Sequence, residues 1–217
     1  MPLVSYALVT LDNTKTFLGI TDNSKNALLE LLINMATDYI ETQTGRRFTS
    51  SVNTYEKHDG TGTNQLKLNN FPIITPPAVI LEVNSAVDNT SDWATISADD
   101  YFIDTATGII TRTSSFLDFE TTGDNDEILS EIRFSCGKDK YRATYTSGFA
   151  TVPYDLQYAC MTLVGQFYNT KAGSGIKSES LGDHSITYQD ITELTSGMKG
   201  GILEDILTKY RDIPLAN

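Results

Sequence analysis

The sequence predicts an α+β protein with a small helical core, made of two long packed helices plus short N- and C-terminal helices, and a β-rich insertion between them. Apolar residues recur at spacings of three and four over residues 24–43 and 153–170, which is the period of amphipathic helices. Between residues 46 and 146, short runs of threonine, β-branched and aromatic residues alternate with Gly, Pro, Asn and Asp. That composition is typical of strands joined by turns.

The helical part begins with a short helix and continues with a long one. Thr10 predicts an N-cap because its hydroxyl can accept from a free amide of the first turn, and Gly19 can end the helix, which gives a helix over residues 11–18. The helix at 24–43 carries one apolar stripe, and Gly45 lies where a left-handed C-cap would fall. At 1.5 Å per residue, this helix would be about 30 Å long.

The residue pattern of the insertion predicts seven short strands separated by turns. Asp-Gly-Thr-Gly at 59–62 and Ala-Thr-Gly at 106–108 are turn sequences. Prolines 72, 76 and 77 place their neighbours at sheet edges or in connections. The expected strands are 48–57, 65–68, 79–83, 101–103, 109–112, 128–135 and 141–146.

Helical periodicity returns after the insertion. Pro153 suits the first position of the helix at 153–170, and residues 171–183 have the small, polar composition of a loop. A short strand at 185–188 and a short amphipathic helix before Pro214 follow. The two long helices are expected to pack on each other through Leu28, Leu32, Met35, Tyr39, Leu156, Cys160, Leu163 and Phe167.

These elements predict a single domain over residues 1–217. Its N-terminal helical part spans 1–45 and the β-rich insertion spans 46–146. The last part, 147–217, would hold a core helix, a loop and a C-terminal helix.

Composition and charge exclude several classes of protein. Hydrophobic residues make up 40% and charged residues 20% of the chain, and the net charge is −12, which disfavours a basic face for nucleic acid. No apolar run reaches the roughly 18–20 residues of a membrane span, and the N-terminus lacks the pattern of a signal peptide. We therefore expect a soluble, unexported protein with protein partners and no membrane contact.

Motifs for catalysis or metal binding are missing. The chain has no GxxxxGK[ST] loop, Ser147 lacks a GxSxG elbow, and residues 124–127 lack the EF-hand spacing. Its two cysteines and two histidines show no zinc-ligand spacing. These observations predict that the protein is not an enzyme and binds no metal or cofactor. A hydrolase stays open as an alternative, because a catalytic pair of carboxylates can come from distant positions of the sequence.

Four motifs, in order, resemble the head-tail connector (adaptor) proteins of tailed bacteriophages and related gene-transfer particles. They are LVTLDNTKTFLGI at 8–20, YIETQTGRRF at 39–48, YTSGFATVPYDLQYA at 145–159 and ILTKYR at 206–211. The resemblance covers both ends and is weak across residues 49–140. It implies the gp6-like connector family and a structural role without catalysis.

The resemblance also implies partners and a location. Family members form a ring, commonly of twelve copies, beneath the portal protein and present the next surface to a stopper or tail-completion protein. Such a protein belongs to the virion neck and to the host cytoplasm before assembly, and double-stranded DNA passes through the ring without specific binding. The C-terminal segment would be mobile and then dock on the portal through Ile202, Ile206, Tyr210 and Arg211.

The acidic residues cluster in one segment. Residues 85–131 have a net charge of −10, whereas the rest of the chain has −2. One interpretation is a set of solvated loops. The other, for a connector, is that part of this segment faces the DNA channel or the stopper, with Asp118, Glu120, Asp124, Asp126 and Glu127 as candidates.

A different function also fits part of the sequence. The threonine and tyrosine content, together with Trp93 in an expected loop, is compatible with a β-rich carbohydrate or receptor-binding module of a phage or bacterium. Ring formation would favour the connector, whereas glycan binding by a monomer would favour the module.

Overall fold

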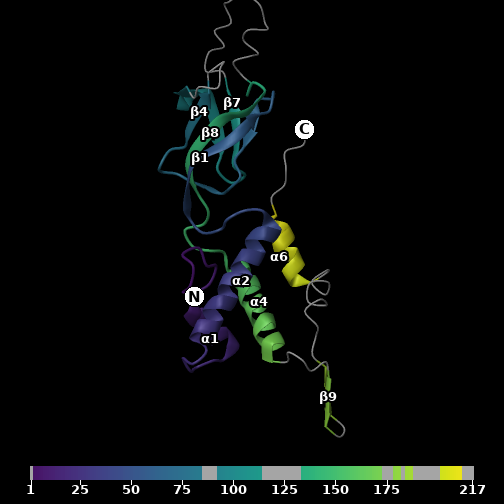
Figure 1. Ribbon diagram of the computed structural model, residues 1–217. Helices are drawn as coiled ribbons and strands as arrows, with labels where there is room; N and C mark the ends of the chain where they lie inside the picture. The colour runs from purple at the N-terminus through teal and green to yellow at the C-terminus, as the bar shows by residue number, and fades with distance from the viewer. Residues whose placement is uncertain are drawn as a thin grey trace, which may run out of the picture. The chain divides into compact units, whose positions relative to one another are not determined.

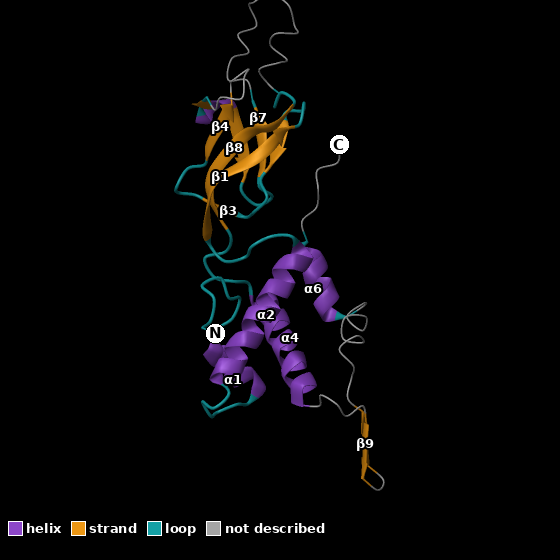
Figure 2. Cartoon of the chain, in the orientation of Figure 1, coloured by secondary structure: helices purple, strands orange, loops and turns teal. Residues whose placement is uncertain are grey.

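The computed structural model describes residues 2–84, 92–113, 133–172, 178–181, 184–187 and 201–211. The chain forms two compact units. The helical unit comprises Met1–Thr49 and Thr151–Pro214, and the β unit comprises Ser50–Ala150 with Leu215–Asn217. The described α-helices lie in the helical unit and the two larger sheets lie in the β unit (Figures 1 and 2), so the predicted α+β class is confirmed.

The helical unit is built around two long helices. They are α2 (Asn26–Thr44) and α4 (Tyr154–Ala172), and they contact each other; α1 (Leu11–Leu18) and α6 (Ile202–Tyr210) each contact both of them (Figure 1). The predicted caps of α1 are confirmed, because the Asn13 amide donates to Thr10 Oγ1 and Gly19 has a left-handed φ of 67°.

Packing between α2 and α4 confirms part of the predicted core and corrects the rest. The buried apolar residues are Leu29, Leu32, Ile33, Ala36 and Ile40 on α2 and Leu156, Ala159, Cys160, Leu163 and Val164 on α4. Leu28, Tyr39 and Phe167 are only half-buried. The prediction that Met35 is a core residue was wrong, because its side chain is 48% exposed. Apolar residues occupy more than one stripe of α2, and the buried stripe is centred on Ile33 and Ala36 rather than on Met35.

Two buried polar residues of α2 hold the N-terminal segment. Asn34 Oδ1 accepts from the Val4 amide at 3.1 Å, and its Nδ2 donates to the Pro2 carbonyl at 3.1 Å. The Leu8 amide donates to Thr37 Oγ1 at 3.3 Å. The segment before α1 therefore follows α2 and gives partners to Asn34 and Thr37, as buried polar groups require.

Two antiparallel sheets form the β unit. The five-stranded sheet has the order β1-β8-β4-β5, with β3 pairing β8, and the three-stranded sheet has the order β2-β7-β6. A short 3-10 turn at Ala98–Asp100 precedes β6. The strand bounds are β1 Ser51–Gly60, β2 Gln65–Lys67, β3 Ile73–Ile74, β4 Ile80–Asn84, β5 Trp93–Thr95, β6 Tyr101–Asp104, β7 Ile109–Arg112 and β8 Gly137–Ser147.

Both sheets contribute to one hydrophobic core. Alternate residues of β8 point inward, so Tyr141, Ala143 and Tyr145 are buried while the residues between them are half-buried. They pack with Leu81 of β4 and with residues of the second sheet and its connections, among them Leu66, Leu68, Ile96, Ile110 and Phe134. The two sheets thus each have an inner face on this core and an outer face away from it.

Most predicted strands are present, with shifted bounds. The strands β3 and β5, with two and three residues, are not among the expected strands. Of the expected strand 128–135, residues 133–135 are not in a strand, and 128–132 lie outside the described residues. The expected loop at 171–183 was wrong in part, because β9 (Ser178–Leu181) pairs with β10 (His184–Thr187).

Candidate interaction surfaces

A polar contact anchors α6 on the start of α4. The Tyr210 hydroxyl donates to Asp155 Oδ1 at 2.9 Å, and Lys209 Nζ lies 2.7 Å from Asp155 Oδ2. The Tyr210 ring also meets Phe48 edge to face, with centroids 5.7 Å apart. Asp155 thus joins residues that lie 54 and 55 positions further along the chain.

This anchor changes the expected docking surface. Tyr210 is 9% exposed and Leu207 is also buried, so the expectation of a mobile C-terminal segment is wrong for α6. Tyr210 is satisfied internally, and Ile206 is half-buried. Ile202, 68% exposed, and Arg211, also exposed, are the predicted docking residues that remain accessible.

We expect the stability that this contact between α6 and α4 contributes to depend on pH through Asp155. Burial raises the pKa of this carboxyl, but hydrogen bonds from Lys209 and Tyr210 outweigh burial, and the folded pKa is lowered. A lowered folded pKa contributes stability that is complete above the ordinary Asp pKa of about 3.9 and is lost as pH falls through the folded value. Asp155→Asn should therefore destabilise the helical unit more at pH 7 than at an acid pH below the ordinary Asp pKa, because the contribution fades as pH falls through the lowered folded value. Urea unfolding followed by circular dichroism at both pH values checks this, and equal losses at the two values would contradict it.

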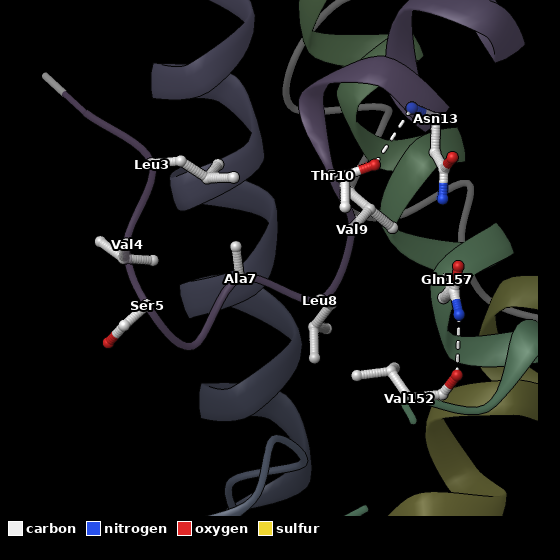
Figure 3. Close-up of a pocket in the computed structure, with 10 residues that line it drawn as sticks. All are labelled: Leu3, Val4, Ser5, Ala7, Leu8, Val9, Thr10, Asn13, Val152 and Gln157. Carbon is white, nitrogen blue, oxygen red and sulfur yellow. Dashed lines mark hydrogen bonds between the residues drawn. The ribbon is translucent and has the colours of Figure 1, made fainter. Parts of the chain in front are cut away.

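A cavity of about 370 Å³ opens between the N-terminal segment and the start of α4 (Figure 3). On the side of the cavity that α4 forms, Gln157 Nε2 donates to the Val152 carbonyl at 2.8 Å. The lining residues are apolar or neutral polar and include no acid, base, histidine or cysteine, so this cavity offers a contact surface and no acid–base chemistry. They are Leu3, Val4, Ser5, Ala7, Leu8, Val9, Thr10, Asn13, Val152 and Gln157.

Large apolar side chains are exposed on several elements of the helical unit. On α2, Leu31 and Met35 lie one turn apart. Phe17 of α1 contacts Tyr158 of α4 edge to face at 6.1 Å, and both rings are exposed. A chain that contacts other subunits on more than one side would place apolar residues in this way.

The β unit holds a partly buried polar cluster that joins β1 to β8. The Tyr145 hydroxyl donates to Glu56 at 2.8 Å from Oε1, and His58 Nε2 lies 2.8 Å from the same oxygen. The Asn69 amide donates to Oε1 at 3.1 Å. Burial raises the pKa of Glu56, but these donors outweigh it and the pKa is lowered; burial and the Glu56 charge raise the pKa of Tyr145. An ionised carboxylate with its donors in place is a structural link and a poor general acid.

The remaining predicted residues have different outcomes. Trp93 lies on the strand β5 and not in a loop. The predicted channel residues Asp118, Glu120, Asp124, Asp126 and Glu127 lie outside the described residues. Cys160 is buried, which raises the pKa of its thiol to about 12, and Cys136 is exposed.

Within the described part of the chain, no three His, Cys, Asp or Glu side chains gather as a metal site would require. Among the same residues, no helix has the length and apolar character to cross a membrane.

Solved structures with a similar fold come from gene transfer agent particles. The neck of the native particle, computed with C12 symmetry, contains a chain that is 15% identical, with a TM-score of 0.52. Chains from the virion of the native particle and from the neck of the empty particle, computed with C6 symmetry, are each 14% identical, with TM-scores of 0.52 and 0.51. Each comparison covers 100% of this chain and 96% of the other.

A family model gives the sequence evidence. No curated protein matches the chain. Residues 8–92, which include α1, α2 and the strands through β4, match the model of the phage gp6-like head-tail connector proteins. The resemblance of this chain to the gp6-like head-tail connector family, indicated by its sequence motifs, is therefore confirmed.

Proposed function

We propose that the chain is a structural head-tail connector, or adaptor, which forms a ring under the portal and joins the DNA-filled capsid to the stopper or tail. The family match at residues 8–92 is the observation that carries this proposal. The fold likeness to chains of gene transfer agent necks supports it over the whole length.

Ring formation is consistent with the exposed apolar residues. Neighbours in a ring make heterologous contacts, in which one patch meets a different patch of the next copy. Leu31 with Met35, and Phe17 with Tyr158, are exposed groups on different helices. The C6 and C12 symmetries of the similar neck structures agree with a ring of up to twelve copies.

Particles made without this chain test the proposal. A connector acts after the head is filled, so its loss should leave DNA-containing heads without tails, or heads that lose their DNA. Electron microscopy and DNA content measure both results, and supplying the chain in trans should restore tailed particles. Normal tailed particles without the chain would contradict the proposal.

The exposed end of α6 is the proposed portal contact. Ile202 is an exposed apolar residue in the first turn of α6. Ile202→Asp should weaken binding of the full chain to portal rings at least tenfold and leave its unfolding curve unchanged, because Ile202 contributes little to the core. Thr208→Asp on another side of the same helix is the matched control. Co-sedimentation measures both, and equal binding of the two variants would exclude this contact.

The acidic segment 85–131 is proposed to lie in part along the channel or against the stopper, since double-stranded DNA must pass without binding. Replacing Asp118, Glu120, Asp124, Asp126 and Glu127 with their amides should then alter assembly, DNA retention or ejection at low salt, where charge effects are largest. Particles that match the unmodified ones in all three measurements would leave the segment as solvated loops.

A further inference from the structure

The last residue of α6 is held by side chains from two other segments of the helical unit. Arg46 and Phe48 follow the end of α2, and Asp155 lies in the first turn of α4. The guanidinium carbon of Arg46 is 5.1 Å from the ring centroid of Phe48 and 5.9 Å from that of Tyr210. The two rings meet edge to face, and the Tyr210 hydroxyl donates to Asp155 at 2.9 Å. We name Arg46, Phe48, Asp155 and Tyr210 the Tyr210 clamp.

Arg46 is buried in this clamp although it carries a charge. The residue is 7% exposed, whereas the side chain of the next residue, Arg47, is 51% exposed. Taking a guanidinium out of water costs free energy, and apolar residues of similar volume often give equal or greater stability at buried charged positions. Core stability alone therefore does not account for a cation at position 46.

The other contacts of α6 leave its orientation weakly defined. This helix has nine residues, its N-cap Gly201 makes no side-chain hydrogen bond, and a helix of this length is not stable alone. Leu207 is buried with Tyr210, but burial of apolar surface has no preferred direction. The attraction between a cation and an aromatic ring requires the cation over the ring face within about 6 Å. The contacts of Arg46 therefore depend on direction in a way that those of Leu207 do not.

The orientation of α6 sets the place of its exposed end. Ile202 is 68% exposed and belongs to the first turn of α6, and Arg211 follows the last turn. At 1.5 Å per residue, Ile202 lies about 12 Å from Tyr210 along the helix, so a tilt of about 10° at the Tyr210 end would move Ile202 by about 2 Å. A contact surface fixed before binding avoids the cost of ordering it on binding.

We infer that Arg46 is a positioning residue, which holds α6 through the rings of Phe48 and Tyr210 in the orientation that presents Ile202 and Arg211 to the portal. This inference rests on the proposed connector function and adds a buried residue that controls the portal contact without touching the portal. A chain in which only a fraction of molecules has α6 in this orientation binds more weakly in proportion to that fraction.

Distances between spin labels on α2 and α6 test the orientation directly. Met35→Cys and Asp205→Cys place labels at exposed positions of the two helices, in a Cys136→Ser background that leaves only the buried Cys160. Double electron–electron resonance on the free full chain should give one narrow distance distribution. Arg46→Met removes the charge but keeps a long apolar stem, and the fraction of molecules at the original distance should fall at least about threefold, as expected of two cation–ring contacts.

Arg47→Met is the matched control, because it makes the same change at the neighbouring residue. The Arg47 guanidinium lies over the Tyr6 ring at 4.4 Å and near Glu41, so its loss should leave the distance between α2 and α6 unchanged. An unchanged distribution in Arg46→Met, or an equal broadening in Arg47→Met, overturns the inference.

Portal binding shows whether the orientation matters for the contact. Without the labels, Arg46→Met should weaken co-sedimentation with portal rings by the factor by which the original distance is depopulated, and Arg47→Met should bind as the unmodified chain does. A lower urea midpoint of Arg46→Met with unchanged distances and unchanged binding would make Arg46 a stabilising residue only, and overturns the inference.

Two further comparisons separate this inference from the connector proposal. Weaker portal binding of Ile202→Asp with unchanged binding of Arg46→Met would exclude the positioning role and leave the connector proposal intact. Normal tailed particles without the chain would exclude the connector proposal itself.

Discussion

Replacing Leu163 with alanine is expected to lower the free energy of unfolding of the helical unit by about 2–5 kcal/mol. Leu163 is 1% exposed and lies on α4, which packs against α2. The substitution removes buried methyl groups and leaves a cavity that the surrounding helices fill only in part. Urea unfolding followed by far-UV circular dichroism reports on this unit, because it contains all the helices longer than one turn among the described residues.

Met35→Ala is the matched control for this experiment. Met35 is also a long apolar residue of a core helix, but its exposure predicts a change of less than about 0.5 kcal/mol. A neutral Leu163→Ala, or a Met35→Ala variant as unstable as Leu163→Ala, would contradict the observed packing of α2 on α4.

Gly60→Ala is expected to destabilise the β unit by about 1–3 kcal/mol or more. A Cβ added to Gly60 would lie 1.8 Å from the Ser135 carbonyl oxygen and 2.8 Å from its carbon, both backbone atoms. The backbone must move to relieve this contact, and Gly60 pairs with Gly137 at the end of the β1–β8 ladder. The substitution should therefore open this end of the largest sheet.

Trp93 makes this effect measurable within one unit. It is the only tryptophan of the chain and lies on β5, so its fluorescence follows unfolding of the β unit. Gly201→Ala, where an added Cβ meets nothing within 4 Å, is the control and should leave the fluorescence transition unchanged. An unchanged transition for Gly60→Ala would mean that β1 does not approach Ser135 as the structure describes.

Local signals predicted the helices well. Thr10 caps the start of α1, Gly19 caps its end, and Gly45 ends α2. These ends could be predicted because caps depend on residues next to the helix ends. Which apolar stripe of α2 is buried depends on the elements packed around the helix. Periodicity alone therefore could not show that Met35 is exposed.

Long-range contacts account for most of what the sequence did not predict. Asp155 and Tyr210 are 55 residues apart, and Glu56 and Tyr145 are 89 apart, so no local pattern connects them. The side-chain partners of Asn34 are backbone atoms near the N-terminus, which become visible only in the folded chain. The stacking of Tyr55 and Trp93 on Arg142 likewise depends on the register of four strands in one sheet.

Cryo-electron microscopy of the particle neck tests the connector proposal most directly. The particles should carry this chain with a small protein domain fused to its C-terminus, and the unmodified particles serve as the reference. The account predicts one ring of the chain in contact with the portal, with extra density for the fused domain repeated around that ring. A neck without this ring, or fused-domain density only at the tail tip or on the capsid surface, would contradict it.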